Sequence, residues 1–407
     1  MPRFPAATLC LLAVATALHA QHPLAPRIAA TLAARESALI AFRHDLHQHP
    51  ELSGQEERTA GLVAARLRAL GFTVRTGVGG HGVVALLTGG RPGPVVAFRA
   101  DMDAVPSTDL DPAPYRSLVP GVRHICGHDI HTTVGLAIAE AFAAVRMELP
   151  GRLLLIFQPA EERASGAAAM LQDSLFSLAR PAAIYAVHTA PLEVGRLGSE
   201  PGPFFAGRDR VAITLTGDSG LAAAVDSARA LVAASATITL AEARGELTPG
   251  FVLAEVGPVA GTGRERVVWG TLSIADPAAR ARTRARLERA VRALERPGLT
   301  ATLRYDARAI PGVLNDSLMV TRADARLRAL LGDSAVVRVG VVPPLFSEDF
   351  GAYDRVAPTA MYLLGVSNAA QGWVGMPHTA GYVADDAAIV VGARAMAEVL
   401  LGRLSGP

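Results

Sequence analysis

The chain has 407 residues, of which half are apolar and 19% are charged, so it is a globular rather than a disordered chain. Its formal net charge is +2 and it contains no block of like charges, which argues against nucleic acid or an anionic membrane as the main partner. The length is large for one hydrophobic core and suggests two domains.

Residues 1–20 have the pattern of a secretory signal peptide. Arg3 precedes an apolar run at 6–17, and small residues near 15–20 offer a cleavage point. The run is too short to span a bilayer, and a buried first helix is the alternative interpretation. We therefore expect a periplasmic or secreted protein. Cleavage would remove Cys10 and leave Cys126 as the single cysteine.

Further along the chain, short apolar runs alternate with helical patterns. The predicted strands are 83–87, 95–99, 153–157, 184–188 and 361–364. The predicted helices are 27–70, broken near Pro50, then 132–145 and 380–401. This alternation predicts an α/β fold, with a mostly parallel sheet covered by helices on both faces. Ligands of such sheets bind beyond the carboxyl ends of the strands.

The pattern changes between residues 206 and 312. Strands are predicted at 210–216, 267–274 and 300–305, and helices at 221–234 and 277–294. The segment 206–312 is therefore predicted to be a smaller α+β domain. It is inserted between two parts of the larger domain, 21–205 and 313–407.

The hexapeptide at 126–131 places soft and borderline metal ligands close together. Cys126 is followed by His128, and a thiolate beside an imidazole suits Zn²⁺ or Mn²⁺ better than Ca²⁺ or Mg²⁺. A buried thiol beside surface histidines is the alternative.

More candidate ligands follow the predicted strands. Asp101 and Asp103 come after strand 95–99, and Glu161 and Glu162 come after strand 153–157. Adjacent glutamates point in different directions, so one can bind a metal ion while its neighbour accepts a proton from water. A pair of metal ions would have enough ligands in Cys126, His128, Glu162, His188 and His378. Taken singly, each has an ordinary explanation, such as a solvated acidic pair, a turn cap or a core imidazole.

Six motifs together carry a family resemblance. They are His44-Asp45-Leu46-His47-Gln48-His49-Pro50-Glu51-Leu52-Ser53, Arg99-Ala100-Asp101-Met102-Asp103-Ala104-Val105-Pro106, Cys126-Gly127-His128-Asp129-Ile130-His131-Thr132, Gln158-Pro159-Ala160-Glu161-Glu162, Ser347-Glu348-Asp349-Phe350 and Pro377-His378-Thr379-Ala380. In these motifs and their order, the chain resembles the binuclear-metal amidohydrolase and peptidase family of aminoacylases, hippurate hydrolases, auxin-conjugate hydrolases and related carboxypeptidases.

The resemblance implies two divalent metal ions, Zn, Mn or similar, in a catalytic α/β domain. It also implies that the inserted domain is a lid that often dimerises, so we expect either a homodimer or a monomer. Its first strand is expected to pair with a partner's edge.

By position in the motifs, Cys126 would bridge the metal ions and Glu161 would act as the general base. The remaining ligands would be His128, Glu162, His188 and His378. Residues that orient these ligands would be Asp101, Asp129 and His131, with an ordinary histidine at a helix N-terminus as the alternative interpretation of His131.

The lid departs from the family pattern at two positions. Leu221 stands where relatives carry a histidine that stabilises the oxyanion, and Ser273 stands where they carry an arginine that binds the substrate carboxylate. Arg264 or Arg266 could take over substrate binding, although both are equally explained as surface charges. The lid could otherwise contribute little, with the metal centre alone polarising the carbonyl.

The function implied is hydrolysis of the amide bond in small N-acyl amino acids or similar conjugates by a metal-activated water. One alternative is a metallocarboxypeptidase or dipeptidase, which needs a carboxylate-binding cation. The other is an inert metal- or amide-binding relative with an altered lid.

Overall fold

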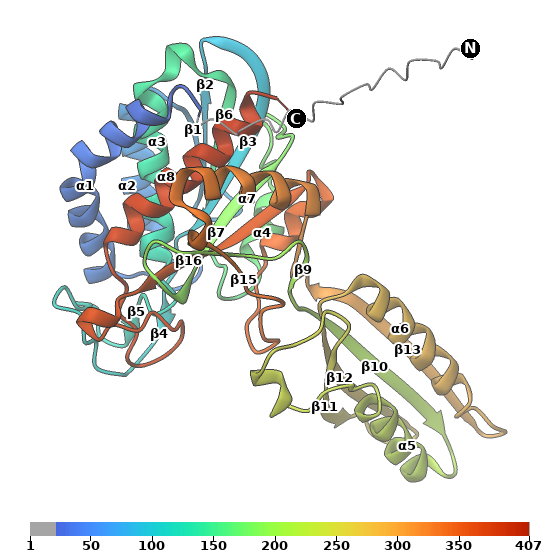
Figure 1. Ribbon diagram of the computed structural model, residues 1–407. Helices are drawn as coiled ribbons and strands as arrows, with labels where there is room; N and C mark the ends of the chain where they lie inside the picture. The colour runs from blue at the N-terminus through green and yellow to red at the C-terminus, as the bar shows by residue number, and fades with distance from the viewer. Residues whose placement is uncertain (1–21, 407) are drawn as a thin grey trace, which may run out of the picture.

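The computed structural model describes residues 22–406, so the predicted signal peptide lies outside the described residues. The larger part of the chain is built on an eight-stranded sheet (Figure 1). In sheet order its strands are β1 (Thr73–Val78), β2 (Gly82–Thr88), β6 (Pro150–Gln158), β3 (Arg91–Asp101), β7 (Ile184–Glu193), β16 (Thr359–Ser367), β8 (Leu197–Ser199) and β15 (Val336–Arg338). The four central strands β6, β3, β7 and β16 are parallel to one another.

Helices cover both faces of this sheet because the central strands are apolar on both sides. On one face lie α1 (Ala25–Gln48), α2 (Glu57–Ala69), α3 (His128–Ala144), α7 (Ser317–Leu331) and α8 (Ala387–Leu404). On the other face lie α4 (Gly166–Gln172) and the 3₁₀ turns at Phe350–Arg355. Helix α3 is almost wholly buried, as its continuous apolar sequence requires.

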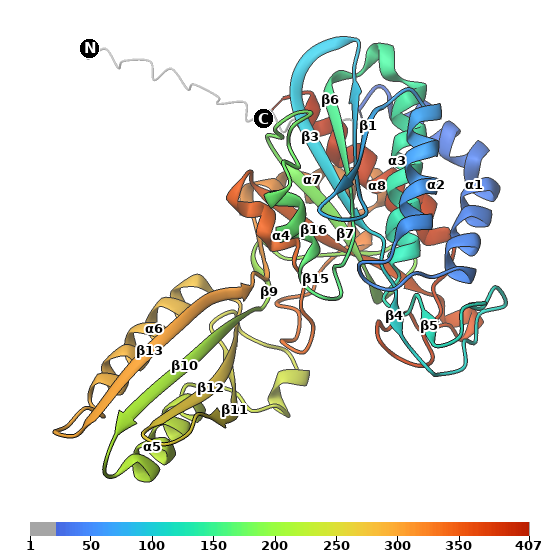
Figure 2. The same cartoon turned by 180° about the vertical axis from the view of Figure 1, so that it is seen from behind.

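A second sheet of four antiparallel strands projects from the first (Figure 2). Its order is β11 (Val252–Ala260), β12 (Glu265–Ile274), β10 (Gly207–Gly217) and β13 (Leu299–Ile310). Helices α5 (Leu221–Ala233) and α6 (Pro277–Arg292) pack on one face of it. Two short ladders complete the chain: β9 (Gly202–Phe205) with β14 (Val313–Asn315), and β4 (Val105–Pro106) with β5 (Val122–Arg123).

The predicted fold class is confirmed, and all four strands of the second sheet fall inside the predicted segment 206–312. The boundary positions of that segment stay predictions. Within residues 22–406, no helix combines the length and apolarity that crossing a membrane requires.

The structure differs from the predicted elements in one helix start, in two elements that were missed, and in the position of the first lid strand. The helix predicted from residue 380 begins at Ala387, because residues 380–386 form the loop that follows His378. Strand β11 and helix α7 were not predicted at all. The first lid strand, β10, lies between β12 and β13, so it has no free edge for a partner; the edges are β11 and β13.

Candidate metal centre

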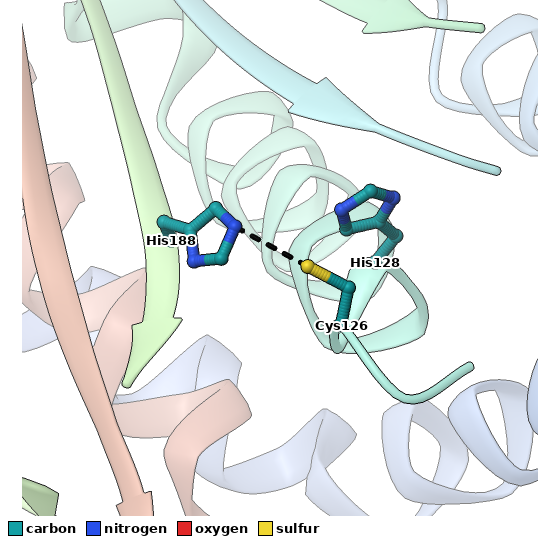
Figure 3. A group of neighbouring side chains, drawn as sticks. All are labelled: Cys126, His128 and His188. Atoms are coloured by element: carbon teal, nitrogen blue, oxygen red, sulfur yellow. Dashed lines mark hydrogen bonds between the residues drawn. The ribbon is translucent and has the colours of Figure 1, made fainter. Parts of the chain in front are cut away.

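The candidate ligands meet at the carboxyl ends of the parallel strands. Cys126 lies in the loop before α3, His128 is the first residue of α3, and His188 lies on β7 (Figure 3). Glu162 follows β6, and His378 lies in the loop between β16 and α8. Strand β7 continues past His188 to Glu193, so this histidine projects from within a strand and not from its end.

The donor atoms form two overlapping groups. Cys126 Sγ lies 3.4 Å from His188 Nε2, and these atoms form one group with His128. Cys126 forms the other group with Glu162 and His378, whose Oε1 and Nε2 atoms are 3.4 Å apart. Within each group all donor atoms lie within 4.8 Å of one another. Because Cys126 belongs to both, a single thiolate is placed to contact two ions.

The imidazoles of the site differ in protonation. Burial lowers the pKa of His188, and it lowers the pKa of His378 to about 4. Both rings are therefore neutral and can present a lone pair to a metal ion. Burial also disfavours the charged form of His128, but the carboxylates of Asp101 and Asp103 outweigh it and raise its pKa to about 10. The His128 ring is therefore protonated, and its positive charge partly neutralises the carboxylates of Asp101, Asp103 and Glu162 around it.

Cys126 lies in a similarly anionic environment. Burial raises the pKa of its thiol well above the usual value, and the carboxylates of Glu162 and Glu161 raise it further. Without a cation beside it, the sulfur stays protonated. Metal ligation would require loss of this proton.

The types of donor atom in the site, and two buried atoms that lack hydrogen-bond partners, both fit the binding of two divalent cations. In the chain from residue 22 to 406, His128 Nε2 and Glu162 Oε1 are buried without a hydrogen-bond partner, 3.7 Å apart. Unpaired buried polar atoms are costly, and both of these belong to the ligand groups. One thiolate, three imidazoles and one carboxylate form a donor set that Zn²⁺ or Mn²⁺ accepts.

Asp103 orients His128, a role that the sequence did not predict. Its Oδ1 atom lies 3.2 Å from His128 Nδ1, which leaves Nε2 for the metal. Its Oδ2 atom accepts hydrogen bonds from the Glu162 backbone N–H at 2.9 Å and from the Ser53 hydroxyl at 2.5 Å. One carboxylate therefore holds two candidate ligands. The spacing of Asp101, the last residue of β3, and Asp103 two positions later was the available signal, since it places both at the same strand end.

His131 and Asp101 lie beside the ligands and bind each other. His131 Nδ1 is 2.6 Å from Asp101 Oδ1, and its Nε2 accepts the backbone N–H of Thr189 at 2.8 Å. Since both nitrogens are occupied, His131 supports the segment next to His188. Asp101 is also paired with Arg99 at 2.5 Å and lies 3.8 Å from His128 Nε2.

Asp129 faces away from the ligands. Its Oδ2 atom accepts from Arg43 at 2.7 Å and lies 2.8 Å from His47 Nδ1, so it ties α3 to α1. The structure gives it no hydrogen bond to any of the five candidate ligands among the residues described. Asp129 therefore fixes the helix that starts at His128, and it acts on the ligand through the backbone.

Glu161 is buried, 5% exposed, and lines the cavity next to the ligands. Its Oε2 atom lies 3.9 Å from His128 Nε2, and its carboxylate groups with those of Glu348 and Asp349. Burial and the neighbouring carboxylates of Glu348 and Glu162 raise the pKa of Glu161 well above its usual range. A carboxyl group whose pKa is raised above its usual range holds a proton more readily, which suits a group that accepts a proton from water and returns it to a leaving amine.

The buried guanidinium of Arg99 partly neutralises this acidic cluster. It binds Glu348 at 3.0 Å and Asp349 at 3.3 Å. The sequence contained both acids in a family motif, but nothing local indicated that they lie beside Glu161. Contacts between residues nearly 190 positions apart leave no periodic signal.

The lid residues considered for substrate binding lie far from the ligands of their own chain. Arg264 is paired with Asp218 and is 68% exposed, and Arg266 bonds to backbone carbonyls of its own turn. Both lie next to the C-terminal end of β10, at Gly217. The N-terminal end of this strand follows β9, and the two ends of the 11-residue strand are roughly 30 Å apart. Leu221 follows the C-terminal end, whereas Ser273 is buried near the other. The structure does not bring Arg264 or Arg266 to the site.

Comparison with known proteins places this arrangement among established relatives. Residues 97–402 match the family model described as Peptidase family M20/M25/M40. A Synechocystis protein described as a probable hydrolase is 34% identical over 369 residues, covering 87% of this chain and 92% of its own. An IAA-amino acid hydrolase of Arabidopsis thaliana is 30% identical over 348 residues, covering 82% and 78%.

Among solved structures, the chain is similar to a dinuclear metal-binding peptidase of the M20 family from Bacillus subtilis. The two share 28% sequence identity with a TM-score of 0.76, over 92% of this chain and 99% of the other. The likeness covers both sheets, since nearly the whole of each chain is aligned.

Proposed function

The chain belongs to peptidase family M20/M25/M40, and from that premise we propose that it hydrolyses the amide bond of small N-acyl amino acids or similar conjugates. It is a metal-dependent amidohydrolase whose cofactors are two divalent metal ions. The Arabidopsis relative, which is matched over most of its length, is described as a hydrolase of IAA-amino acid conjugates, and this supports the substrate class.

One observation carries the proposal: two donor groups share Cys126, and the free carboxylate of Glu161 lies beside them. We assign Cys126 as the bridging ligand and Glu161 as the general base. The terminal ligands are His128, Glu162, His188 and His378. Asp101, Asp129 and His131 support them, as does Asp103.

Two divalent cations bound by these residues would supply activation of a water and polarisation of the substrate carbonyl. Glu161 accepts the proton that the attacking water loses as its oxygen bonds to the carbonyl carbon. The same carboxyl group then donates that proton to the amide nitrogen as the C–N bond breaks. The products are a carboxylic acid and a free amine. Arg99 keeps the acids behind Glu161 in place during this cycle.

The rival interpretations have less support. A free dipeptide carries a charged α-amino group on the acyl side of its amide, and among the described residues the apolar wall of the cavity beside the ligands has no acidic side chain to pair with that charge. An inert binder has no need for a buried carboxylate of raised pKa next to intact ligands.

Substituting Glu161→Gln tests the assignment of the base. We expect kcat to fall about 10²- to 10⁴-fold while the metal-to-protein ratio stays at the wild-type value, because Glu161 is not a ligand. Glu162→Gln is the matched control at the adjacent residue, and it should lower the metal content. Steady-state kinetics and elemental analysis distinguish the two. Full activity of Glu161→Gln would remove it from the role of base.

A substrate panel with and without chelator tests the reaction itself. N-acyl amino acids should be hydrolysed and free dipeptides should not, with activity lost on chelation and restored by Mn²⁺ or Zn²⁺. Chelator-insensitive hydrolysis, or hydrolysis of no member of the panel, would refute the proposed function.

A homodimer formed through the lid is a further part of the proposal. The edges of β11 and β13 are unpaired in the described chain and can accept a partner's strand. Sedimentation equilibrium of the whole chain measures the mass directly. A monomer at micromolar concentration would exclude a stable dimer.

Export is the last part of the proposal, supported by the pattern of residues 1–20. Expression of the full chain should yield a mature protein that lacks this segment, in the periplasm or the medium. N-terminal sequencing of the purified protein identifies the first residue. A cytoplasmic protein that begins at residue 1 or 2 would contradict it.

A further inference from the structure

A cavity of about 550 Å³ opens directly onto the candidate metal centre. Cys126, Glu161, Glu162, His188 and His378 form its polar end. The volume falls within the usual range for sites that enclose small molecules. It is much larger than a water and an amide group need, so it is available to another part of the substrate.

Apolar side chains from five separate segments form most of the remaining cavity wall. They are Leu192 at the end of β7, Phe205 at the end of β9, Leu363 on β16, Met376 in the loop before His378, and the group Val339, Val342, Pro343, Leu345 and Phe346. The segment around Val342 is held in place, because its backbone N–H donates to the Phe204 carbonyl at 2.8 Å. This part of the cavity wall is therefore fixed in position by the fold before a substrate binds.

The distribution of charge along the cavity is one-sided. Of the lining residues within 22–406, the ionisable ones all belong to the metal end, and the other polar side chains are the uncharged hydroxyls of Thr189 and Ser347. The chain contains no lysine. A carboxylate buried against the apolar wall would have no counter-charge, which is strongly unfavourable.

Because the ionisable side chains all lie at the metal end, the charge distribution determines which side of the substrate enters the cavity. In an N-acyl amino acid the carboxylate is attached one carbon from the amide nitrogen, whereas the acyl side can be wholly apolar. With the amide held at the metal end, the acyl side is the one that can enter the cavity without burying a charge. An acetyl group would leave most of the volume unfilled.

We propose that this cavity selects substrates with a bulky, neutral acyl group, either aromatic or a medium-length alkyl chain. The inference rests on the proposed hydrolase function and adds its acyl specificity. Each methylene buried against such a wall favours the substrate about fourfold.

Comparison of acyl groups on one amino acid tests the proposal. The full chain, loaded with Mn²⁺ or Zn²⁺, is given N-acetyl-, N-hexanoyl-, N-benzoyl- and N-succinyl-methionine. We expect kcat/KM for the hexanoyl and benzoyl substrates to exceed that for the acetyl substrate at least about tenfold, with the succinyl substrate poorest. Hydrolysis in which the acetyl or succinyl substrate is best would overturn the acyl inference and leave the hydrolase function standing. No chelator-sensitive hydrolysis of any of them would overturn the function, and the inference with it.

A charge added at the cavity rim gives a second test. Leu345 is 40% exposed, so Leu345→Arg can be accommodated without burying the guanidinium. It should raise the ratio of kcat/KM for N-succinyl- over N-butanoyl-methionine about tenfold or more, because a cation then faces the acyl carboxylate.

The matched control is Leu318→Arg, which changes a 57% exposed leucine on α7 outside this cavity. Its ratio should equal that of the wild type. Since each ratio comes from one protein preparation, partial unfolding cancels. Equal ratios in the Leu345 and Leu318 variants would overturn the assignment of this wall to the acyl group.

Discussion

The turn between Cys126 and His128 depends on a backbone conformation that glycine adopts most easily. Gly127 has φ of +87°, and a Cβ added there would lie 2.3 Å from the Tyr382 hydroxyl and 2.6 Å from Thr189 Oγ1. The same turn points a thiol and an imidazole toward one site. A small change at this residue therefore affects two ligands.

We predict that Gly127→Ala lowers both metal content and stability, by more than about 2 kcal/mol, since left-handed strain adds to a steric overlap. Gly195→Ala is the control. Its φ is +93°, but an added Cβ has open space around it, so only about 1 kcal/mol should be lost. Urea unfolding and elemental analysis measure both effects. Equal losses in the two variants, with full metal content, would contradict this account of the turn.

His47 should make stability depend on pH. Burial lowers its pKa, but hydrogen bonds with Asp111 and Asp129 outweigh burial and raise the pKa above 6.5. Only the protonated ring can donate to both carboxylates, at 3.1 Å and 2.8 Å. Because the folded pKa is raised, the stabilisation is complete below pH 6.5 and is lost as the pH rises through the folded value.

Substituting His47→Gln should therefore destabilise the protein most at pH 6, by about 3 kcal/mol, and progressively less up to pH 9. Unfolding free energies of the wild type and the variant across this range give the difference. A difference that stays constant, or grows with pH, would show that the protonated ring is not what stabilises the fold.

Helices α1, α3 and α8 are joined by one buried arginine. Arg43 on α1 donates to Asp129 at the start of α3 at 2.7 Å, and to Asp386 just before α8 at 3.0 Å. These helices carry or flank His128 and the loop of His378. Their relative positions therefore set the spacing of the ligand groups.

Removal of this contact by Arg43→Met should cost about 3–5 kcal/mol, because the buried Asp129 carboxylate loses its permanently charged partner and, of the described residues, keeps only His47. Arg58→Met removes a pair with Asp45 in which both side chains are more than a third exposed, and should cost less than about 1 kcal/mol. Chemical denaturation compares the two. A similar small loss in both variants would mean that the helices hold their positions without Arg43.

Helices and strands with strong patterns were predicted well, and their ends less so. The break between α1 and α2 was placed correctly near Pro50. The start of α8 was wrong by seven residues, since the preceding loop is also apolar and alanine-rich. A local pattern specifies the type of an element, but its end depends on which residues are needed elsewhere, here in the loop carrying His378.

On the scale of the whole molecule, the acidic centre should make stability depend on metal ions. The raised pKa values of Glu161 and Cys126 show how strongly the protein disfavours negative charge at this site without a cation. Metal ions bind the folded state, and at 100 times the Kd such binding adds about 2.7 kcal/mol.

We therefore predict that Mn²⁺ or Zn²⁺ raises the Tm and that a chelator lowers it. Cys126→Ser should show a smaller increase, since it weakens a ligand shared by both groups. Differential scanning calorimetry measures the shift. An unchanged Tm with and without metal would argue against a resident binuclear centre.

The sequence alone determined the fold class, the resemblance to a metal-dependent hydrolase family, and the residue types that would bind metal; the fold class and the family are confirmed. Such features lie in short contiguous motifs and in apolar periodicity, both of which can be recognised without coordinates.

Only the tertiary structure decided which groups surround these motifs. Asp103 lies within hydrogen-bond distance of His128, and Asp129 accepts a hydrogen bond from Arg43. Glu348 and Asp349 lie beside Glu161. The apolar cavity is formed by segments that are distant in the sequence. The tertiary structure also separated Arg264 and Arg266 from the site. Each of these results depends on contacts between residues distant in the sequence. Such contacts follow from how the elements pack and leave no mark in local composition.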